Sequence, residues 1–144
     1  MTDLSIIIPV LNEEKNVELL HKSIANSLKK WKIGYEIIFI DDGSTDNSYN
    51  LLAKLHKRDK GIKVIKFAGN FGQTSAWDAG IKAAKGRYII TMDSDLQNDP
   101  SDIPRMLNAI KNSDYDAISG WRTNRKDSFS KKSLRFVRHP EMAS

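Results

Sequence analysis

Short apolar segments alternate with longer stretches that are apolar on one side along most of the chain. Five of the short segments are rich in β-branched and aromatic residues and predict buried strands, at residues 4–10, 35–40, 63–67, 88–92 and 115–120. Helices are predicted between them, beginning near Asn12, near Thr45 or Asp46, near Thr74, and near Ser101 or Asp102. This order predicts an α/β fold with a mainly parallel sheet and helices on both of its faces.

Residues 122–144 show no clear period and differ in charge from the rest of the chain. They hold seven Lys and Arg residues against two acidic residues, whereas residues 1–121 are neutral overall. We therefore expect one α/β domain over residues 1–121 and then a basic tail, residues 122–144, for which no ordered structure is predicted. A basic segment favours an anionic partner, either phosphate groups or a membrane surface. No recognition motif indicates that the chain binds nucleic acid.

Two carboxylates, Asp93 and Asp95, directly follow the fourth predicted strand. Side chains two residues apart in an extended segment share a face, so we expect both carboxylates to point the same way. Such a pair is repulsive unless a cation or a proton lies between the two groups. The chain has no cysteine, and oxygen ligands alone suit a hard ion. The pair therefore predicts a site for Mg²⁺ or Mn²⁺.

Other polar residues also follow the predicted strands, where open α/β sheets bind their ligands. They are Asn12 and Glu13, Asp41 and Asp42, Asn70 and Gln73, the run from Asp93 to Gln97, and then Arg122 and Arg125. Loops and helix caps use the same residue types, and that alternative explains Asp46, Asp99 and Ser101 well. Doubled carboxylates after two different strands favour a ligand site instead.

Several kinds of protein are excluded by what the sequence lacks. It has neither the glycine-rich fingerprint of a dinucleotide-binding fold nor the phosphate-binding loop of P-loop NTPases. The run that starts at Asp93 fails as a calcium-binding loop, because Asn98 and Pro104 occupy its glycine and glutamate positions. The three histidines are scattered, which disfavours a Ser-His-Asp hydrolase. No apolar run is long enough to span a membrane.

Seven short motifs follow one another along the chain. They are Ile8-Pro9-Val10-Leu11-Asn12-Glu13, Asp41-Asp42-Gly43-Ser44-Thr45-Asp46, Asn70-Phe71-Gly72-Gln73, Ala79-Gly80, Ala84-Lys85-Gly86, Asp93-x-Asp95-Leu96-Gln97 and Gly120-x-Arg122-x-x-Arg125-x-Asp127. In this order they resemble the family 2 nucleotide-sugar glycosyltransferases, which have a GT-A fold with a Rossmann-like nucleotide-binding half. The branch that the chain resembles most is that of the dolichyl- or polyprenyl-phosphate sugar transferases, and the resemblance covers nearly all of residues 4–127.

The resemblance implies roles for individual residues. A nucleotide-sugar donor would be bound by residues 1–121, where the implied contacts are Pro9, Asn12, Glu13, Asp41, Asp42, Gln73 and Ser94. Asp41 or Asp42 would face the base or the ribose. Asp93 and Asp95 would hold Mg²⁺ or Mn²⁺ on the donor diphosphate, with Gln97 as a further ligand. Arg122 and Arg125 would hold the phosphate of a polyprenyl or dolichyl phosphate acceptor, so that Asp93, Asp95, Arg122 and Arg125 form the implied catalytic set.

The implied reaction is transfer of the sugar to the acceptor phosphate with inversion. A phosphate oxygen is largely ionised near neutral pH, so it needs little help from a general base. The implied place is the cytoplasmic face of a membrane, contacted through the basic segment. Because the family's catalytic domain continues beyond the last motif, we expect a chain that is short at its C-terminus. Two alternatives stay open: a non-catalytic remnant that binds nucleotide or membrane, and a family 2 transferase that acts on a sugar hydroxyl.

Overall fold

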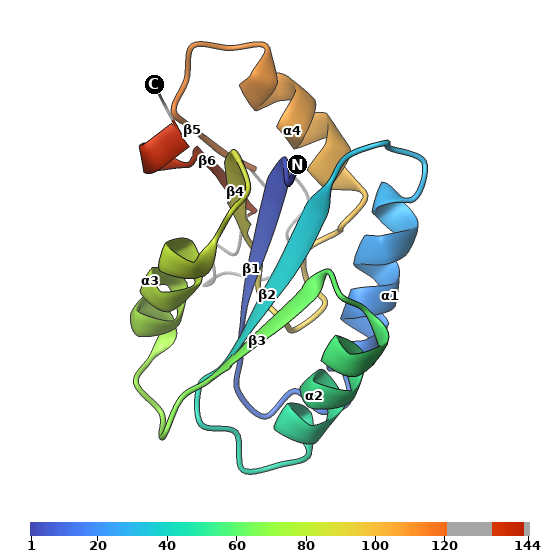
Figure 1. Ribbon diagram of the computed structural model, residues 1–144, viewed down its shortest axis with the longest axis vertical. Coiled ribbons are helices and arrows are strands. Elements are labelled where there is room, and N and C mark those ends of the chain that lie inside the picture. Colours follow the sequence, from blue (N-terminus) through green and yellow to red (C-terminus); the bar gives the residue numbers. More distant parts are fainter. Residues whose placement is uncertain (121–133, 143–144) are drawn as a thin grey trace, which may run out of the picture.

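The computed structural model describes residues 1–120 and 134–142, which form one six-stranded sheet with helices on both faces (Figure 1). The predicted α/β fold is confirmed. The strands are β1 (Leu4–Val10), β2 (Tyr35–Asp41), β3 (Ile62–Lys66), β4 (Tyr88–Thr91), β5 (Ala117–Ser119) and β6 (Arg135–Arg138). The helices are α1 (Val17–Leu28), α2 (Ser48–Arg58), α3 (Gln73–Ala83), α4 (Asp102–Lys111) and a 3-10 turn, η1 (Pro140–Met142).

The sheet has the order β3-β2-β1-β4-β6-β5, and its first four strands are parallel. β1 lies at the centre, with Leu4 paired to Tyr35 of β2 on one side and to Tyr88 of β4 on the other. The carboxyl ends of β1, β2 and β4 therefore meet at one edge of the sheet. The loops that follow these strands are the ones that carry the predicted site residues.

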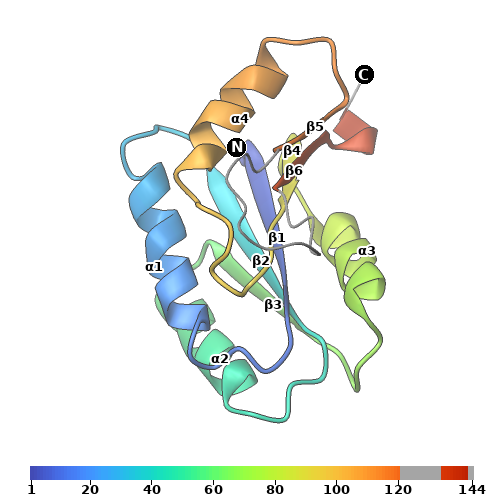
Figure 2. The same ribbon diagram turned by 180° about the vertical axis from the view of Figure 1, so that it is seen from behind.

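The two faces of the sheet are covered unequally, as the two opposite views show (Figure 1, Figure 2). Helices α1, α2 and α4 lie on one face and pack on Ile6, Ile8 and Phe39 in the larger core cluster. Of the described helices, α3 alone covers the other face, where Ala76 packs on Ile7 and its neighbours. Because alternate residues of β1 enter different clusters, the strand has no polar face, and this explains its continuous apolar sequence.

Helix α3 lies very close to the sheet, as its run of small residues leads one to expect. A Cβ atom added to Gly80 would come within 2.4 Å of Cγ2 of Ile7, well inside van der Waals contact. Glycine is therefore required at this crossing. The close approach sets the position of the first residue of α3, Gln73, which lies at the functional edge of the sheet.

The sequence analysis missed one strand. β6 lies within the segment for which no ordered structure was predicted, yet it pairs antiparallel with both β4 and β5. Phe136 of β6 is fully buried in the larger core cluster. The fifth predicted strand is also shorter than expected, since β5 comprises only Ala117–Ser119. The division of the chain at residue 121 stays a prediction.

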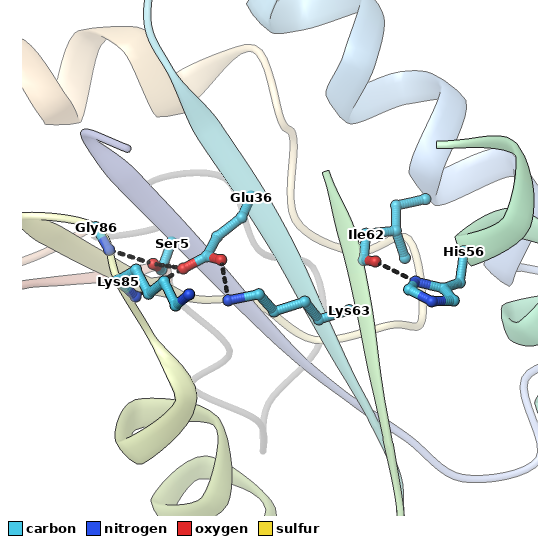
Figure 3. A network of polar contacts seen from close by, with 7 residues as sticks. All are labelled: Ser5, Glu36, His56, Ile62, Lys63, Lys85 and Gly86. Atoms are coloured by element: carbon cyan, nitrogen blue, oxygen red, sulfur yellow. Dashed lines mark hydrogen bonds and ion pairs between the residues drawn. The ribbon is translucent and has the colours of Figure 1, made fainter. Parts of the chain in front are cut away.

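A buried ion pair joins strands near the amino ends, away from the predicted site (Figure 3). Glu36 of β2 lies 2.6 Å from Nζ of Lys63 in β3 and accepts hydrogen bonds from Oγ of Ser5 and from the backbone N–H of Lys85. The N–H of Gly86 donates to Oγ of Ser5. Burial by itself would raise the pKa of Glu36, but these hydrogen bonds and the Lys63 charge lower it overall. The carboxylate thus stays charged and ties three strands together.

Within residues 1–120 and 134–142, no helix is long and apolar enough to cross a membrane.

Candidate functional site

A pocket of about 390 Å³ opens at the carboxyl edge of the sheet. It brings together eight of the predicted residues, from the loops after β1, β2, β3 and β4 and from the start of α3: Pro9, Glu13, Asp42, Asn70, Gln73, Asp93, Ser94 and Asp95. Asn12, Asp41 and Gln97 are predicted residues that do not line it. Arg122 and Arg125 lie outside the described residues.

Asn12 holds the loops after β1 and β2 together. Its backbone has a positive φ of 53°, and its side-chain oxygen accepts hydrogen bonds from the N–H groups of Thr45 and Asp46 at 2.8 and 3.3 Å. Its own N–H donates to Oγ of Ser44 at 3.0 Å. These contacts use the side-chain oxygen and the backbone N–H of Asn12 in shaping the edge of the pocket.

The two aspartates at the end of β2 have different environments. Asp42 accepts hydrogen bonds from the N–H groups of Phe71 and Gly72, at 2.7 and 3.0 Å, with one carboxylate oxygen for each. It therefore anchors the loop between β3 and α3. Asp41 is fully buried; its Oδ1 accepts from the N–H of Ser44, but its Oδ2 has no hydrogen-bond partner among residues 1–120 and 134–142.

Asp93 and Asp95 both line the pocket, as the alternation of side chains predicts. Nε2 of Gln73 donates to Oδ1 of Asp93 at 2.8 Å, and the N–H of Gln97 donates to Oδ1 of Asp95 at 3.2 Å. The side chain of Gln97 belongs to a separate hollow beside α1, with Leu19 and Leu20. Among the described residues, no three histidine or acidic side chains are arranged so that they could together hold a metal ion.

The pair fits a divalent ion of the kind that substrate phosphates help to bind. Mg²⁺ typically takes one or two carboxylates from the protein and completes its shell with phosphate oxygens and water. Asp93 and Asp95 can supply those two carboxylates. Gln97 stays a predicted further ligand; the contact described between it and the pair is the hydrogen bond from its backbone N–H to Oδ1 of Asp95.

Two further residues in the pocket were not predicted. Arg135 enters from β6, and its guanidinium carbon lies 5.9 Å from the ring centroid of Trp77 in α3. Trp77 follows Gln73 by four residues, so helical spacing alone could have placed it on the pocket side of α3. Arg135 carries no such signal, because its position depends on the pairing of β6 with β4, which the sequence does not reveal.

The pocket is acidic. Among the described residues that line it, four are carboxylates, Glu13, Asp42, Asp93 and Asp95, and one is a cation, Arg135. Helix α3 begins at this wall, so its positive end also lies here. An anionic ligand would need a cation at the carboxylates to offset the repulsion. The arrangement suits a phosphate-bearing ligand that binds together with a metal ion.

Solved structures share this fold at low sequence identity. A mannosyltransferase from Pyrobaculum calidifontis, in complex with GDP-Man and Mn²⁺, matches 93% of this chain with a TM-score of 0.77, at 15% identity and over 44% of its own chain. Glucosyl-3-phosphoglycerate synthase from Mycobacterium tuberculosis, in complex with Mn²⁺, UDP and phosphoglyceric acid, matches 96% with a TM-score of 0.70, at 18% identity and over 56% of its own chain. The likeness confirms a GT-A fold.

Curated relatives are more similar in sequence but much longer. The dodecaprenyl-phosphate galacturonate synthase of Rhizobium johnstonii is 41% identical over 126 residues, which are 87% of this chain and 37% of the relative. The undecaprenyl-phosphate 4-deoxy-4-formamido-L-arabinose transferase of Yersinia pestis is 42% identical over 129 residues, 89% of this chain and 39% of the relative. The chain thus spans less than two fifths of the length of these relatives.

The family resemblance seen in the motifs is confirmed by a match over nearly the whole chain. The model of glycosyl transferase family 2 matches residues 5–141, a range that begins at the second residue of β1 and ends within η1. This protein therefore belongs to glycosyl transferase family 2.

Proposed function

We propose that this protein transfers a sugar from a nucleotide-sugar donor to a polyprenyl phosphate, with inversion at the anomeric carbon. One observation carries the proposal: a single pocket in a family 2 domain gathers the paired carboxylates Asp93 and Asp95 with the loops after β1 and β2. The acceptor class rests on the two relatives, which are named for transfer to dodecaprenyl and undecaprenyl phosphate.

The donor nucleotide is assigned to the β1–β2 side of the pocket. Asp41, next to the pocket-lining Asp42, is assigned to an N–H of the base or a hydroxyl of the ribose; its Oδ2 has no hydrogen-bond partner among the described residues. Asp42 acts indirectly, since its two oxygens fix the loop at Phe71 and Gly72. The diphosphate then lies toward β4, near the positive end of α3.

Asp93 and Asp95 are assigned to a divalent ion, Mg²⁺ or Mn²⁺. Such an ion supplies charge neutralisation for the departing nucleoside diphosphate. Gln73 keeps Asp93 oriented through its hydrogen bond to Oδ1. The nearby carboxylates of the pocket make binding of a bare diphosphate unfavourable, so the proposal includes metal dependence.

The reaction needs positioning more than proton transfer. An ionised oxygen of the acceptor phosphate attacks the anomeric carbon in line with the bond to the diphosphate; that bond breaks, and the nucleoside diphosphate leaves with the electron pair. No proton has to be removed from the nucleophile, because the second pKa of a phosphomonoester is about 6. Arg122 and Arg125, outside the described residues, are assigned to the acceptor phosphate.

The basic segment, residues 122–144, is assigned to a membrane surface. A polyprenyl phosphate is held in a bilayer, so the pocket must come to the headgroup layer to reach it. A surplus of lysine and arginine is attracted to the anionic lipids of a cytoplasmic leaflet. We therefore place the protein at the cytoplasmic face of a membrane.

A thermal-shift panel tests the donor and the metal together. UDP-, GDP- and dTDP-sugars are each added with and without Mn²⁺, and we expect one nucleotide series to raise the melting temperature only when Mn²⁺ is present. Asp95→Ala should abolish that shift. Asp102→Asn is the matched control, because it removes an exposed carboxylate of α4 outside the pocket. A shift of equal size in Asp95→Ala would refute the metal assignment.

Transfer itself is measured with labelled donor and a polyprenyl phosphate in vesicles. Labelled product that requires the phosphate group of the acceptor supports the proposal. Product formed equally well on a neutral polyprenol or on a free sugar would identify a hydroxyl acceptor and overturn the assigned acceptor class.

A further inference from the structure

Strand β6 carries two arginines at its ends, and they are used differently. The guanidinium of Arg138 donates to the backbone carbonyls of Ile110, Ser113 and Tyr115, so it closes the end of α4 onto the sheet. The guanidinium of Arg135 donates no hydrogen bond to a protein group within the described residues, and no ion pair there involves it. Its recorded contact is the ring of Trp77.

The pairing of β6 fixes Arg135 at the pocket. Arg135 lies opposite Thr91, the last residue of β4, and Thr91 itself lines the pocket directly before the metal-binding loop. Phe136, the next residue of β6, is buried in the core on the α4 side of the sheet. Since neighbouring residues of a strand point to opposite faces, Arg135 points to the α3 side, where it meets Trp77.

The guanidinium of Arg135 is well suited to bind an anion. It keeps its charge at every physiological pH, and its planar fork matches the oxygens of a carboxylate or a phosphate. The cation–π contact with Trp77, at 5.9 Å from the ring centroid, leaves its N–H donors unused. A charged donor set that faces a pocket and is not used by described protein groups is suited to an anionic part of a ligand.

The order of strands indicates which part of the substrates lies there. On the proposed function, the nucleotide lies at β2 and β1 and the diphosphate at β4, so the donor runs across the sheet toward β6. Neighbouring strands are about 4.8 Å apart, which is close to the width of one sugar ring. The sugar, and the acceptor phosphate that attacks it, therefore come beside Arg135.

We propose that Arg135 is a positioning residue that binds an oxyanion at the sugar end of the pocket, with Trp77 holding its guanidinium in place. The inference rests on the proposed function and deepens it. Two substrates can bring such a group: a donor whose sugar carries a carboxylate, or the acceptor through its phosphate. In both cases two oxygens of the anion accept hydrogen bonds from the guanidinium.

Binding of four probes to Arg135→Gln distinguishes these sources. UDP-glucuronate and UDP-glucose, each with Mn²⁺, differ only in a carboxylate, while farnesyl phosphate and farnesol differ only in a phosphate. Loss of about tenfold in affinity for UDP-glucuronate, with UDP-glucose unchanged, assigns Arg135 to the sugar carboxylate. A similar loss for farnesyl phosphate, with farnesol and both donors unchanged, assigns it to the acceptor phosphate.

Arg87→Gln is the matched control, because Arg87 also stacks on an aromatic ring, Tyr88, at 5.9 Å but does not line the pocket. Arg135→Lys keeps the charge without the fork and should retain part of the affinity. Unchanged binding of all probes by Arg135→Gln, or an equal loss that includes UDP-glucose, would overturn the inference. The proposed function is tested separately by the unmodified protein, which should bind UDP-glucose in the presence of Mn²⁺. If the unmodified protein binds none of the four probes, both the proposed function and the role of Arg135 are overturned.

Discussion

The side-chain amide of Gln73 donates a hydrogen bond to Oδ1 of Asp93 at 2.8 Å, joining the first residue of α3 to the loop after β4. The two residues are 20 positions apart in the chain, and both line the pocket. Since α3 is held on the sheet by the close approach at Gly80, the amide gives Asp93 a rigid reference point. The orientation of a proposed metal ligand thus depends on the packing of a helix.

Gln73→Leu should weaken metal-dependent donor binding while leaving folding nearly unchanged. Loss of one hydrogen bond to a charged acceptor corresponds to about 1 kcal/mol, or roughly fivefold in affinity. Gln73 is exposed, so the free energy of unfolding should change by less than about 0.5 kcal/mol. Calorimetric titration with nucleotide and Mn²⁺ measures the first effect and urea unfolding the second. Thr74→Ala, the next residue of the same helix, is the control; equal affinities of the two variants would contradict this role.

Asp42→Ala should destabilise the loop between β3 and α3. The carboxylate is almost fully buried and receives the N–H groups of Phe71 and Gly72, so its removal leaves two donors without a partner. We expect the free energy of unfolding to fall by about 2–3 kcal/mol. Hydrogen exchange at Phe71 and Gly72 should accelerate more than exchange in α1. Asp42→Asn keeps one acceptor oxygen, so its free energy of unfolding should lie between those of the unmodified protein and Asp42→Ala. A loss in Asp42→Asn as large as in Asp42→Ala would show that the negative charge, and not the hydrogen bonds, is decisive.

The sequence predicted the parallel part of the fold because its strands are apolar on both faces and are separated by helices with one apolar side. It could not predict β6. The four residues of β6 have charged ends, and their partners lie far along the chain in β4 and β5. Its burial comes from a single side chain, Phe136, between two arginines. A pairing of this kind is decided by tertiary contacts, which a local pattern does not contain.

The site was predicted as a group of residues, but the hydrogen bonds that join its loops were not. Asp41 and Asp42 are identical neighbours in the sequence, yet Asp42 holds a loop with both oxygens and Asp41 has a buried oxygen with no hydrogen-bond partner among the described residues. Asn12 stays a predicted nucleotide contact, and its side-chain oxygen accepts a hydrogen bond from Thr45, which no local pattern indicates. Residue type and position after a strand identify the edge of the sheet that binds ligands. Which oxygens remain available there depends on hydrogen bonds between loops that are distant in sequence.

Glu36→Gln should remove a stabilising contribution that depends on pH. The pKa of Glu36 in the folded protein lies below its ordinary value of 4.5, so the contribution is fully present above pH 4.5 and is lost as the pH falls through the folded value. At neutral pH we expect the variant to be less stable by about 1.5–3 kcal/mol, because Lys63 loses its buried partner. Urea unfolding between about pH 7 and about pH 3 should show the two proteins converging on the acid side. A constant difference over that range would contradict the assignment.

A glycine at the edge of the pocket is needed either for its backbone conformation or for lack of room for a Cβ atom, and Gly43 and Gly72 differ in the second respect. Both have a positive φ, 79° and 93°, so an alanine at either position is strained by about 1–3 kcal/mol. A Cβ atom on Gly43 would also lie 2.5 Å from the carbonyl carbon of Gly69, whereas nothing lies within 4 Å of one on Gly72. Gly43→Ala should therefore lose clearly more stability than Gly72→Ala in urea unfolding. It should also weaken nucleotide binding, because the displaced backbone of Gly69 belongs to the loop that Asp42 holds at the pocket; equal losses in the two variants would show that strain alone decides.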